Sequence, residues 1–349
     1  MAQQQGHRVH RWGHELHWET FDRPVPAEGE VLIKVEACGI GLTVLNTMAG
    51  DLANDPALLP RVPGHEYVGT VAEVGRGVSD NLLSTRVSAY FYLTCGTCSH
   101  CLAGNDARCA NLAGWVGVHR DGGYAPWAVL PAHNAVELPE GLDPVAATVV
   151  SDAVATPVHV ATRAAIRPDD RVAVIGAGGG VGIHMVQVAQ LFGGQVAGLD
   201  LTEEKLTAIE AHGAIPVRAD NMTELGGQLW RDGGPTVVID LVGSNATLRW
   251  SVDALAMGGR LAVLTTFRDR AMKLDPRDLV FRELSVLGSR HASRAEVAQA
   301  GRLVASGQIE PVIGNVVGPD GVADVHEQLL AGGLLGRGAL SWEGHDADG

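Results

Sequence analysis

The sequence is short of basic residues. It contains 26 lysines and arginines against 40 aspartates and glutamates, which gives a formal net charge of −14. A surface of this sign repels nucleic-acid phosphates and anionic lipid headgroups. The composition therefore excludes a general nucleic-acid-binding protein, and it predicts no nucleic-acid partner and no membrane partner.

Long hydrophobic runs are missing as well. No uninterrupted apolar stretch reaches the roughly 18 residues that a membrane-spanning helix needs. The first residues, MAQQQGHRVHRW, lack the apolar core of a signal peptide, so we expect a cytoplasmic protein. The 349 residues are 46% hydrophobic, which is enough to build full cores. At roughly 150 residues per domain, this length predicts two domains.

The pattern of the chain changes near residue 155. Before it, short β-prone runs at 30–37, 67–74 and 135–139 lie among glycine and proline turn signals. After it, strand-like and helical runs alternate, which predicts an α/β fold with a parallel sheet covered on both faces. The expected strands are 171–176, 195–200, 236–243 and 259–267, and the expected helices are 181–192, 202–213 and 245–257. The segment after 290 holds one clear helix, 293–307, and is expected to rejoin the first domain.

Four of the five cysteines fall within one short segment, as Cys95, Cys98, Cys101 and Cys109. In a long intracellular chain such a cluster indicates a metal site rather than disulfides. Four thiolates complete a tetrahedral Zn²⁺ shell and leave no open position for water, so the prediction is one structural zinc ion. Thiolates alone do not separate zinc from an iron–sulfur cluster, which stays open as the alternative.

A glycine-rich segment follows the expected strand 171–176 and opens the next helix. It reads as GxxGxxG through Gly176, Gly179 and Gly182, or as the beginning of GxG through Gly176 and Gly178. Either reading gives a pyrophosphate a tight turn, close backbone approach and the free N–H donors of a helix N-terminus. The predicted dinucleotide-binding residues of this segment are Gly176, Gly178, Gly179, Gly180, Val181 and Gly182.

The second strand of this unit ends in Asp200, eighteen residues after Gly182. A carboxylate at this place accepts hydrogen bonds from both ribose hydroxyls of a dinucleotide. Leu201 and Thr202 offer no arginine for a 2′-phosphate, so the sequence favours NAD over NADP. Val242 and Leu264 are expected to end later strands at the same edge, where the nicotinamide half should lie.

Six segments carry a family resemblance through their order and spacing. They are GHEYVGTVAEVG (64–75), CGTCSHCLAGNDARC (95–109), DGGYA (121–125), VIGAGGGVG (174–182), VIDLVG (238–243) and ELSVLGSR (283–290). Over nearly its whole length the chain resembles the medium-chain dehydrogenase/reductase superfamily, in its zinc-containing alcohol dehydrogenase branch.

The resemblance implies a domain organisation and an assembly. A doubly wound Rossmann domain would cover 154–290. A β-rich GroES-like catalytic domain would cover 1–153 and 291–349, with the structural zinc lobe at about 94–110. The resemblance also implies an active site in the cleft between the domains, and a homodimer or homotetramer.

The same resemblance implies a catalytic zinc site, and here the sequence departs from the family. Family members hold this ion with a cysteine, the histidine of GHE and a third cysteine, aspartate or glutamate. His65 and Glu66 stand in the GHE position and Asp152 stands at the third place. Gly41 stands where the ligand cysteine is expected, whereas Cys38 aligns with a position that does not bind metal.

Two neighbouring positions are changed too. Val44 replaces an acidic residue that supports the metal ligands, and Asn46 replaces the histidine of the proton relay, although Thr43 keeps the hydroxyl of that relay. Loss of a supporting acid by itself weakens metal binding by roughly 10–100-fold. The predicted catalytic residues are Thr43, Asn46, His65 and Asp152.

Three interpretations of the remaining cluster stay open. His65, Glu66 and Asp152 offer nitrogen and oxygen donors that suit zinc or a harder divalent ion, as a catalytic metal site without the cysteine. Without a metal ion, His65 and Asp152 could share a proton and serve as the acid or base, with Thr43 at the hydroxyl position of the relay. Alternatively, the three residues form a buried hydrogen-bonded cluster without a catalytic role.

Three functions are compatible with these observations. The best supported is an NAD-dependent oxidoreductase that interconverts a small-molecule alcohol, secondary or cyclic, and its ketone or aldehyde. The first alternative is a metal-independent NAD(P)H reductase of activated C=C bonds, similar to the quinone and enoyl reductases of the superfamily, which as a rule lack the cysteine lobe. The second is a dinucleotide-binding redox sensor that has lost catalysis.

Overall fold

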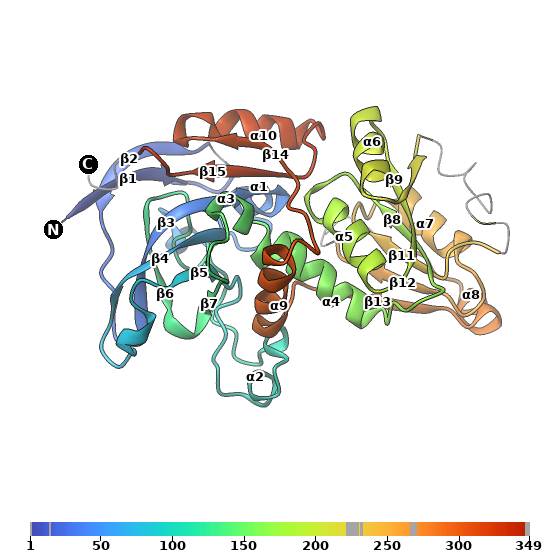
Figure 1. Cartoon of the computed structure of the whole chain (residues 1–349), viewed down its shortest axis with the longest axis horizontal. Coiled ribbons are helices and arrows are strands. Elements are labelled where there is room, and N and C mark those ends of the chain that lie inside the picture. The colour runs from blue at the N-terminus through green and yellow to red at the C-terminus, as the bar shows by residue number, and fades with distance from the viewer. Residues whose placement is uncertain (1, 14, 221–229, 231–232, 266–270, 346–349) are drawn as a thin grey trace. The chain divides into compact units, whose positions relative to one another are not determined.

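The computed structural model describes residues 2–13, 15–220, 230, 233–265 and 271–345. By its internal contacts the chain divides into two compact units (Figure 1). One unit is Met1–Ala155 together with Ala292–Gly349, and the other is Thr156–His291. The boundaries expected from the sequence lie within two residues of these.

The second unit is built on a six-stranded parallel sheet. Its strands are β8 (Arg171–Ile175), β9 (Gln195–Asp200), β10 (Ile215–Arg218), β11 (Val237–Asp240), β12 (Arg260–Val263) and β13 (Ser285–Gly288). Their order is β10-β9-β8-β11-β12-β13, which is the 3-2-1-4-5-6 order of a doubly wound dinucleotide-binding fold. The predicted α/β fold is therefore confirmed for this unit.

Helices pack around this sheet (Figure 1). They are α4 (Ala155–Arg163), α5 (Gly180–Leu191), α6 (Glu203–Ala211), α7 (Asn245–Ala254) and α8 (Pro276–Arg282). Three of them begin with a side-chain cap, since Thr202, Ser244 and Asp275 each accept a hydrogen bond from a backbone N–H of the first turn. The local sequence thus determines where these helices begin. A shared core then holds helix on sheet, for example Trp250 of α7 in one apolar cluster with Leu199 of β9 and Val238 of β11.

Two strands of this sheet end earlier than the sequence analysis predicted. The expected strands 236–243 and 259–267 end at Asp240 and Val263, so Val242 and Leu264 lie beyond the strand ends and not within them. After β11, the Asp240 carboxylate accepts hydrogen bonds from the N–H groups of Val242 and Gly243 at 2.9 and 2.8 Å. In this turn the two N–H groups bind the side chain of Asp240, so they are not used for pairing with a neighbouring strand. Residues 266–267 of the second prediction lie outside the described residues.

The first unit is β-rich, which confirms that part of the predicted architecture. A seven-stranded sheet contains β3 (Glu30–Ile40), β4 (Glu66–Val74), β5 (Arg86–Ala89), β6 (Trp127–Pro131), β7 (Ala135–Glu137), β14 (Ile313–Val317) and β15 (Arg337–Ser341). A separate hairpin joins β1 (Gln3–Arg8) and β2 (His17–Asp22). The helices are α1 (Leu42–Met48), α2 (Ser99–Leu102), α3 (Pro144–Ala147), α9 (Arg294–Ala305) and α10 (Val322–Leu330). The core is lined by side chains such as Ile33, Tyr67 and Leu130.

Strand pairing in this sheet joins distant parts of the chain. β15 runs antiparallel to β3 with Gly338 opposite Ile40, and β3 pairs with β4 with Gly39 opposite Glu66. The beginning of β15 therefore lies beside the end of β3, and the end of β3 lies beside the beginning of β4 on its other side. Residues 41, 66 and 337 meet at this corner of the sheet.

A helical run leads from the first unit into the second. It comprises α3, a π-helical turn at Val150–Val154 and α4. The run Pro144–Arg163 is long and apolar enough to pass a membrane-span test, but 72% of its most apolar window is buried inside the protein, as in core helices of water-soluble folds. Single π-helical turns occur often at functional sites, and this one carries Asp152.

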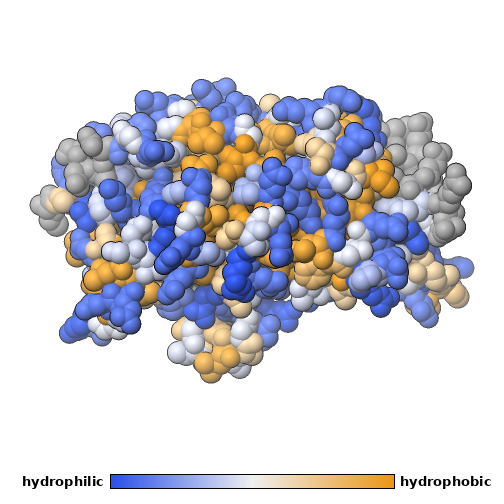
Figure 2. All heavy atoms as spheres, viewed as in Figure 1, coloured by the Kyte–Doolittle hydropathy of each residue, from blue (hydrophilic) through white to orange (hydrophobic). Residues whose placement is uncertain are grey.

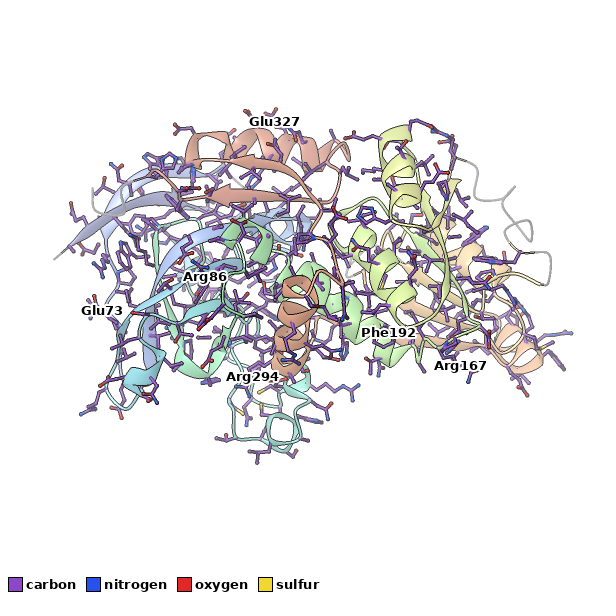
Figure 3. All side chains as sticks on the ribbon, viewed as in Figure 1. Glu73, Arg86, Arg167, Phe192, Arg294 and Glu327 are labelled. Atoms are coloured by element: carbon purple, nitrogen blue, oxygen red, sulfur yellow. The ribbon has the colours of Figure 1, made fainter. Side chains whose placement is uncertain are left out.

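The cysteine-rich lobe is hydrogen-bonded to helix α9. Asp106, which is 2% exposed, accepts hydrogen bonds from the backbone N–H and the Nε–H of Arg294 at the first turn of α9. Arg294 also donates from Nη1 to the carbonyl of His133 at 2.8 Å. Figure 3 shows Arg294 at the end of α9 that lies next to the lobe. In Figure 2 the lobe exposes hydrophobic residues, and Leu102 of α2 is 77% exposed.

This contact yields a stability prediction. Arg294→Ala removes the guanidinium from a buried carboxylate, so the free energy of unfolding should fall by about 1–3 kcal/mol. Arg76→Ala is the matched control, because its ion pair with Glu28 is exposed and should contribute less than about 1 kcal/mol. Urea denaturation measures both variants, and equal losses would contradict the assignment.

Candidate functional site

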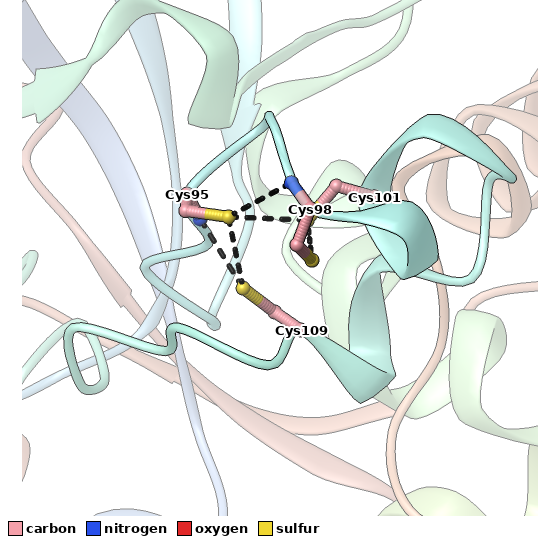
Figure 4. A group of neighbouring side chains, drawn as sticks. All are labelled: Cys95, Cys98, Cys101 and Cys109. Carbon is pink, nitrogen blue, oxygen red and sulfur yellow. Dashed lines mark hydrogen bonds between the residues drawn. The ribbon is translucent and has the colours of Figure 1, made fainter.

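The four predicted cysteine ligands come together in one lobe (Figure 4). The Sγ atoms are 3.5 Å apart for Cys98 and Cys101, 3.5 Å for Cys95 and Cys109, and 4.0 Å for Cys95 and Cys101. Zn–S bonds of about 2.3 Å in a tetrahedron place the sulfur atoms about 3.8 Å apart. The four thiolates therefore fit a structural zinc ion, and the N–H of Cys98 donates to Cys95 Sγ at 3.3 Å, a contact that favours the thiolate form.

The predicted glycine loop connects β8 to α5. Gly176 has φ of +80°, a conformation that glycine adopts without strain. A Cβ atom on Gly182 would lie 2.1 Å from the carbonyl oxygen of Gly176, so only glycine permits this close packing of helix on loop. Gly179 precedes α5, which begins at Gly180 and Val181 and presents its free N–H groups there. The loop fits a pyrophosphate.

Asp200, at the end of β9, lies beside this loop. Its carboxylate accepts hydrogen bonds from the N–H groups of Gly178 and Leu201, both at 2.8 Å, and Lys205 Nζ is 4.0 Å away. The sequence argument missed Arg218. This residue lies opposite Asp200 in the pairing of strand β10 with β9, and its Nη1 donates to the carbonyl of Leu201. An arginine is thus present at the ribose end after all, but it is supplied by the next strand and bound to Glu203 at 2.7 Å.

These contacts predict how the dinucleotide preference can be changed. Asp200→Ser removes the negative charge that repels a 2′-phosphate and leaves Arg218 and Lys205 in place. The affinity for NADPH relative to NADH should rise by about 10–100-fold. Fluorescence titration measures both affinities. The double variant Asp200→Ser/Arg218→Ala should lose most of this gain, and an unchanged gain would show that Arg218 plays no part.

A second cluster lies at the corner of the first unit's sheet. His65 and Glu66 stand at the beginning of β4, Asp152 on the π-helical turn, and Arg337 at the beginning of β15. His65 Nε2 is 3.6 Å from Glu66 Oε1 and 3.7 Å from Asp152 Oδ2. The imidazole packs against the ring of Phe91 at 4.4 Å between centroids. The structure thus brings together three of the predicted residues.

Arg337 binds both carboxylates of this cluster. It donates from Nε to Glu66 Oε2 at 3.1 Å, from Nη2 to Glu66 Oε1, and from Nη2 to Asp152 Oδ2 at 2.8 Å. The side chains of Glu66 and Arg337 are 0% and 6% exposed, whereas that of Asp152 is 13% exposed. Such two-pronged bonds between a guanidinium and a carboxylate are among the stronger charged hydrogen bonds in proteins.

Burial and charge act against each other in this cluster. Burial, and after it the neighbouring Asp152, raises the pKa of Glu66 to about 8, against the opposing effect of Arg337. Burial by itself would lower the pKa of Arg337, but Glu66 and Asp152 raise it, so the guanidinium stays charged. One arginine faces two carboxyl groups, and an added proton on the cluster balances the charge.

Position 41 does not supply the thiolate of the catalytic zinc site that the resemblance implies. A Cβ atom on Gly41 would lie 2.2 Å from Nη1 and 2.6 Å from Cζ of Arg337, so the guanidinium fills the space of the expected cysteine side chain. Cys38 does not replace that ligand, because it is fully buried within β3 beside Gly64 and Gly123. Sequence reasoning missed Arg337, which lies 271 residues after Glu66 and carries no local motif.

The other predicted catalytic residues lie on α1. Thr43 and Asn46 are three positions apart on this helix, hence on one face, and both are half-buried. Val44, between them, is buried in the core of the first unit, as an apolar side chain in place of the expected acid would be.

Comparisons with known proteins agree with the fold. The family model "Alcohol dehydrogenase GroES-like domain" matches residues 27–140, and "Zinc-binding dehydrogenase" matches 180–306. An alcohol dehydrogenase of Geobacillus stearothermophilus is 30% identical, over 94% of this chain and 96% of that protein. An acryloyl-coenzyme A reductase of Metallosphaera sedula is also 30% identical, over 95% of this chain and 97% of that one.

A solved structure is similar over the same length. It is a cobalt- and zinc-bound thermostable alcohol dehydrogenase from Pyrobaculum aerophilum, with a TM-score of 0.88 and 30% identity, covering 97% of this chain and 99% of that chain. Fold, loop and lobe thus define a nicotinamide-dependent oxidoreductase. The chain belongs to the zinc-containing alcohol dehydrogenase family of the medium-chain dehydrogenases/reductases, and it is an NAD-dependent alcohol dehydrogenase-like oxidoreductase with a structural zinc site.

Proposed function

We propose that this chain uses reduced NAD to reduce a carbon–carbon double bond conjugated to a carbonyl group, without a catalytic metal ion. One observation carries the proposal: the Arg337 guanidinium fills the space where the family's ligand cysteine would project from position 41. The interconversion of alcohol and ketone that the family resemblance implies uses a metal ion, held in part by that cysteine, to polarise the oxygen of the substrate. A conjugated double bond is already polarised by its own carbonyl group, so it needs only a hydride and a proton.

The proposed reaction transfers a hydride from the nicotinamide to the β-carbon of the substrate. The electron pair of the double bond moves to the α-carbon, and the enolate that forms there takes up one proton, while NAD⁺ is released. The acryloyl-coenzyme A reductase named above is, by its name, a protein that reduces a substrate of this class. The cysteine lobe, which we assign to structural zinc, takes no part in this step.

For the proton we propose the pair of His65 and Asp152. Arg337 Nη2 donates to Asp152 Oδ2 at 2.8 Å, and the same carboxylate oxygen lies 3.7 Å from His65 Nε2. A carboxylate at this distance stabilises an imidazolium, which is an effective proton donor near neutral pH. Thr43 and Asn46 stay predictions as parts of a relay from this pair to solvent. Gly176, Gly178, Gly179, Gly180, Val181, Gly182 and Asp200 are the residues that we propose for NAD.

A second candidate is the interconversion of a secondary or cyclic alcohol and its ketone. The alcohol dehydrogenases among the relatives favour it. In that reaction the same pair, His65 and Asp152, would act as the base that removes the hydroxyl proton.

Cyclohexenone separates the two candidates, because one molecule carries both reducible groups. Our proposal predicts cyclohexanone as the product with NADH, and no further reduction of cyclohexanone. Product analysis by gas chromatography, with and without a chelator, is the measurement. Formation of cyclohexenol, or turnover of cyclohexanone, would instead establish carbonyl chemistry. The matched coenzyme A pair, acryloyl- and propionyl-coenzyme A, tests a thioester substrate in the same way.

Asp152→Asn tests the proton donor. The amide keeps the shape of the carboxylate but no longer stabilises a charged imidazole, so kcat should fall by about 10²–10⁴-fold. The solvent deuterium isotope effect on kcat should increase, because proton transfer becomes slower than hydride transfer. Ser151→Ala, at the neighbouring buried position, is the control and should stay within about twofold. A kcat of Asp152→Asn equal to that of the control would remove the pair from the mechanism.

A further inference from the structure

The chain passes between its two units at two places, between Ala155 and Thr156 and between His291 and Ala292. The first passage lies inside the helical run that ends with α4. The second lies in a short segment, 289–293, that joins the end of β13 to the beginning of α9. We call residues 289–293 the return segment, because they bring the chain back to the first unit.

The return segment begins at the edge of the second unit's sheet that carries the glycine loop. β8, β11, β12 and β13 are parallel, so β13 ends at the same edge as β8, after which the glycine loop follows. The N–H of Ser289 donates to the carbonyl of Val263 at 3.1 Å. The carbonyl of Gly288 accepts a hydrogen bond from Nε of Arg163 on α4 at 2.6 Å. The return segment thus starts at the edge where we propose that NAD binds.

The other end of the return segment is held by side chains of the first unit. The carbonyl of Ala292 accepts a hydrogen bond from the hydroxyl group of the buried Tyr90 at 2.7 Å. Arg294, the first residue of α9, donates from Nε to the Asp106 carboxylate at 2.5 Å. Between the two ends, His291 has φ of +42°, in the left-handed region that is unfavourable for an L-residue. Such a conformation persists where the structure on both sides fixes it.

The position of Asp106 depends on the cysteine lobe. Asp106 lies between two of the cysteines, Cys101 and Cys109, and its carbonyl accepts a hydrogen bond from the N–H of Cys109 at 2.9 Å. Thiolates as close as these cysteines (Figure 4) repel one another unless a cation lies between them. The zinc ion that we assign to the lobe therefore fixes the loop that carries Asp106, and Asp106 fixes the first turn of α9.

From these contacts we infer that Tyr90 and Asp106 are positioning residues, which couple zinc binding in the cysteine lobe to NADH binding in the second unit through the return segment. A short segment that is fixed at one end loses further conformational freedom when its other end is fixed. The ligand that binds first bears most of this entropic cost, so the second ligand binds more tightly. By linkage, each ligand raises the affinity for the other by the same factor. The inference involves no substrate, so it does not depend on the proposed reaction.

Metal competition at equilibrium tests the coupling in the wild-type protein. The cysteine lobe is loaded with Co²⁺, and a chelator is titrated against it with and without saturating NADH. Thiolate-bound cobalt absorbs at long visible wavelengths, where NADH does not, so this absorption reports the ion in the lobe. We expect NADH to raise the affinity for Co²⁺ by about 5-fold, at the lower end of typical couplings between sites.

The double variant Tyr90→Phe/Arg294→Met releases the end of the return segment without changing a cysteine ligand. In this variant NADH should change the affinity for Co²⁺ by less than about twofold. Tyr67→Phe/Arg76→Met is the matched control and should keep the wild-type factor. Within the described part of the chain the Tyr67 hydroxyl group has no hydrogen-bond partner, and the ion pair of Arg76 with Glu28 is exposed.

Tyr90→Phe alone keeps the buried ring and removes only its hydroxyl group. It should lower the effect of NADH at least about twofold, and it replaces the double variant in the test if the double variant does not fold. A role of these contacts in stability alone would lower the melting temperature but leave the effect of NADH on the Co²⁺ affinity unchanged.

Two results would overturn the inference. One is a wild-type affinity for Co²⁺ that NADH changes by less than about twofold. The other is an effect of NADH in the double variant, or in Tyr90→Phe where that variant replaces it, that equals the effect in the control. The coupling would then arise from unfolding of the metal-free chain as a whole and not from the return segment.

Discussion

The corner of the sheet in the first unit depends on one buried ionic contact, the guanidinium of Arg337 between Glu66 and Asp152. It exists because β15, near the end of the chain, pairs with β3 and places residue 337 beside residue 41. Three segments far apart in the sequence thereby meet on one positive charge. Breaking such a pair leaves a buried charge uncompensated, which is far more costly than the net gain of forming it.

The positive charge at this corner of the sheet comes from the Arg337 side chain, whereas in the family's expected site it comes from a metal ion. In the family's expected site, thiolate and imidazole surround a divalent ion that is open to substrate. Here a permanent monovalent cation is enclosed by two carboxylates, and its donors are used within the protein. Asp152, the most exposed side chain of the cluster, lies beside the buried His65, and the two are a pair suited to moving a proton. Without a metal ion to polarise the substrate, the reacting bond must already be polarised. We therefore propose a double bond conjugated to a carbonyl group as the substrate.

Much of the fold could be predicted from the sequence, because it depends on patterns of residues that are close together along the chain. Apolar strands alternating with capped helices predict a parallel sheet, and the observed β8, β9 and α5 begin and end within one residue of the expected segments. The expected strands 236–243 and 259–267 are longer than the observed β11 and β12. Apolar composition does not reveal where a turn such as that after Asp240 begins. The cysteine cluster was equally readable, since its four ligands are close in sequence.

The site was less accessible to sequence reasoning. The sequence shows that Gly41 lacks a thiolate, but not what fills the space, because Arg337 reaches it only through strand pairing across the sheet. Arg218 was missed for the same reason, as it lies on the strand next to Asp200 and not in the loop after it. Residues that act together through tertiary contacts, without a fixed spacing along the chain, leave no motif to find.

The central claim is that a guanidinium fills the space of the family's ligand cysteine and that no catalytic ion binds beside it, and a crystal structure with diffraction data measured across the zinc absorption edge tests it most directly. The account predicts one anomalous peak per chain, among Cys95, Cys98, Cys101 and Cys109, and electron density for the Arg337 guanidinium beside Gly41. A second anomalous peak coordinated by His65 and Asp152, with Arg337 turned away from them, would contradict it.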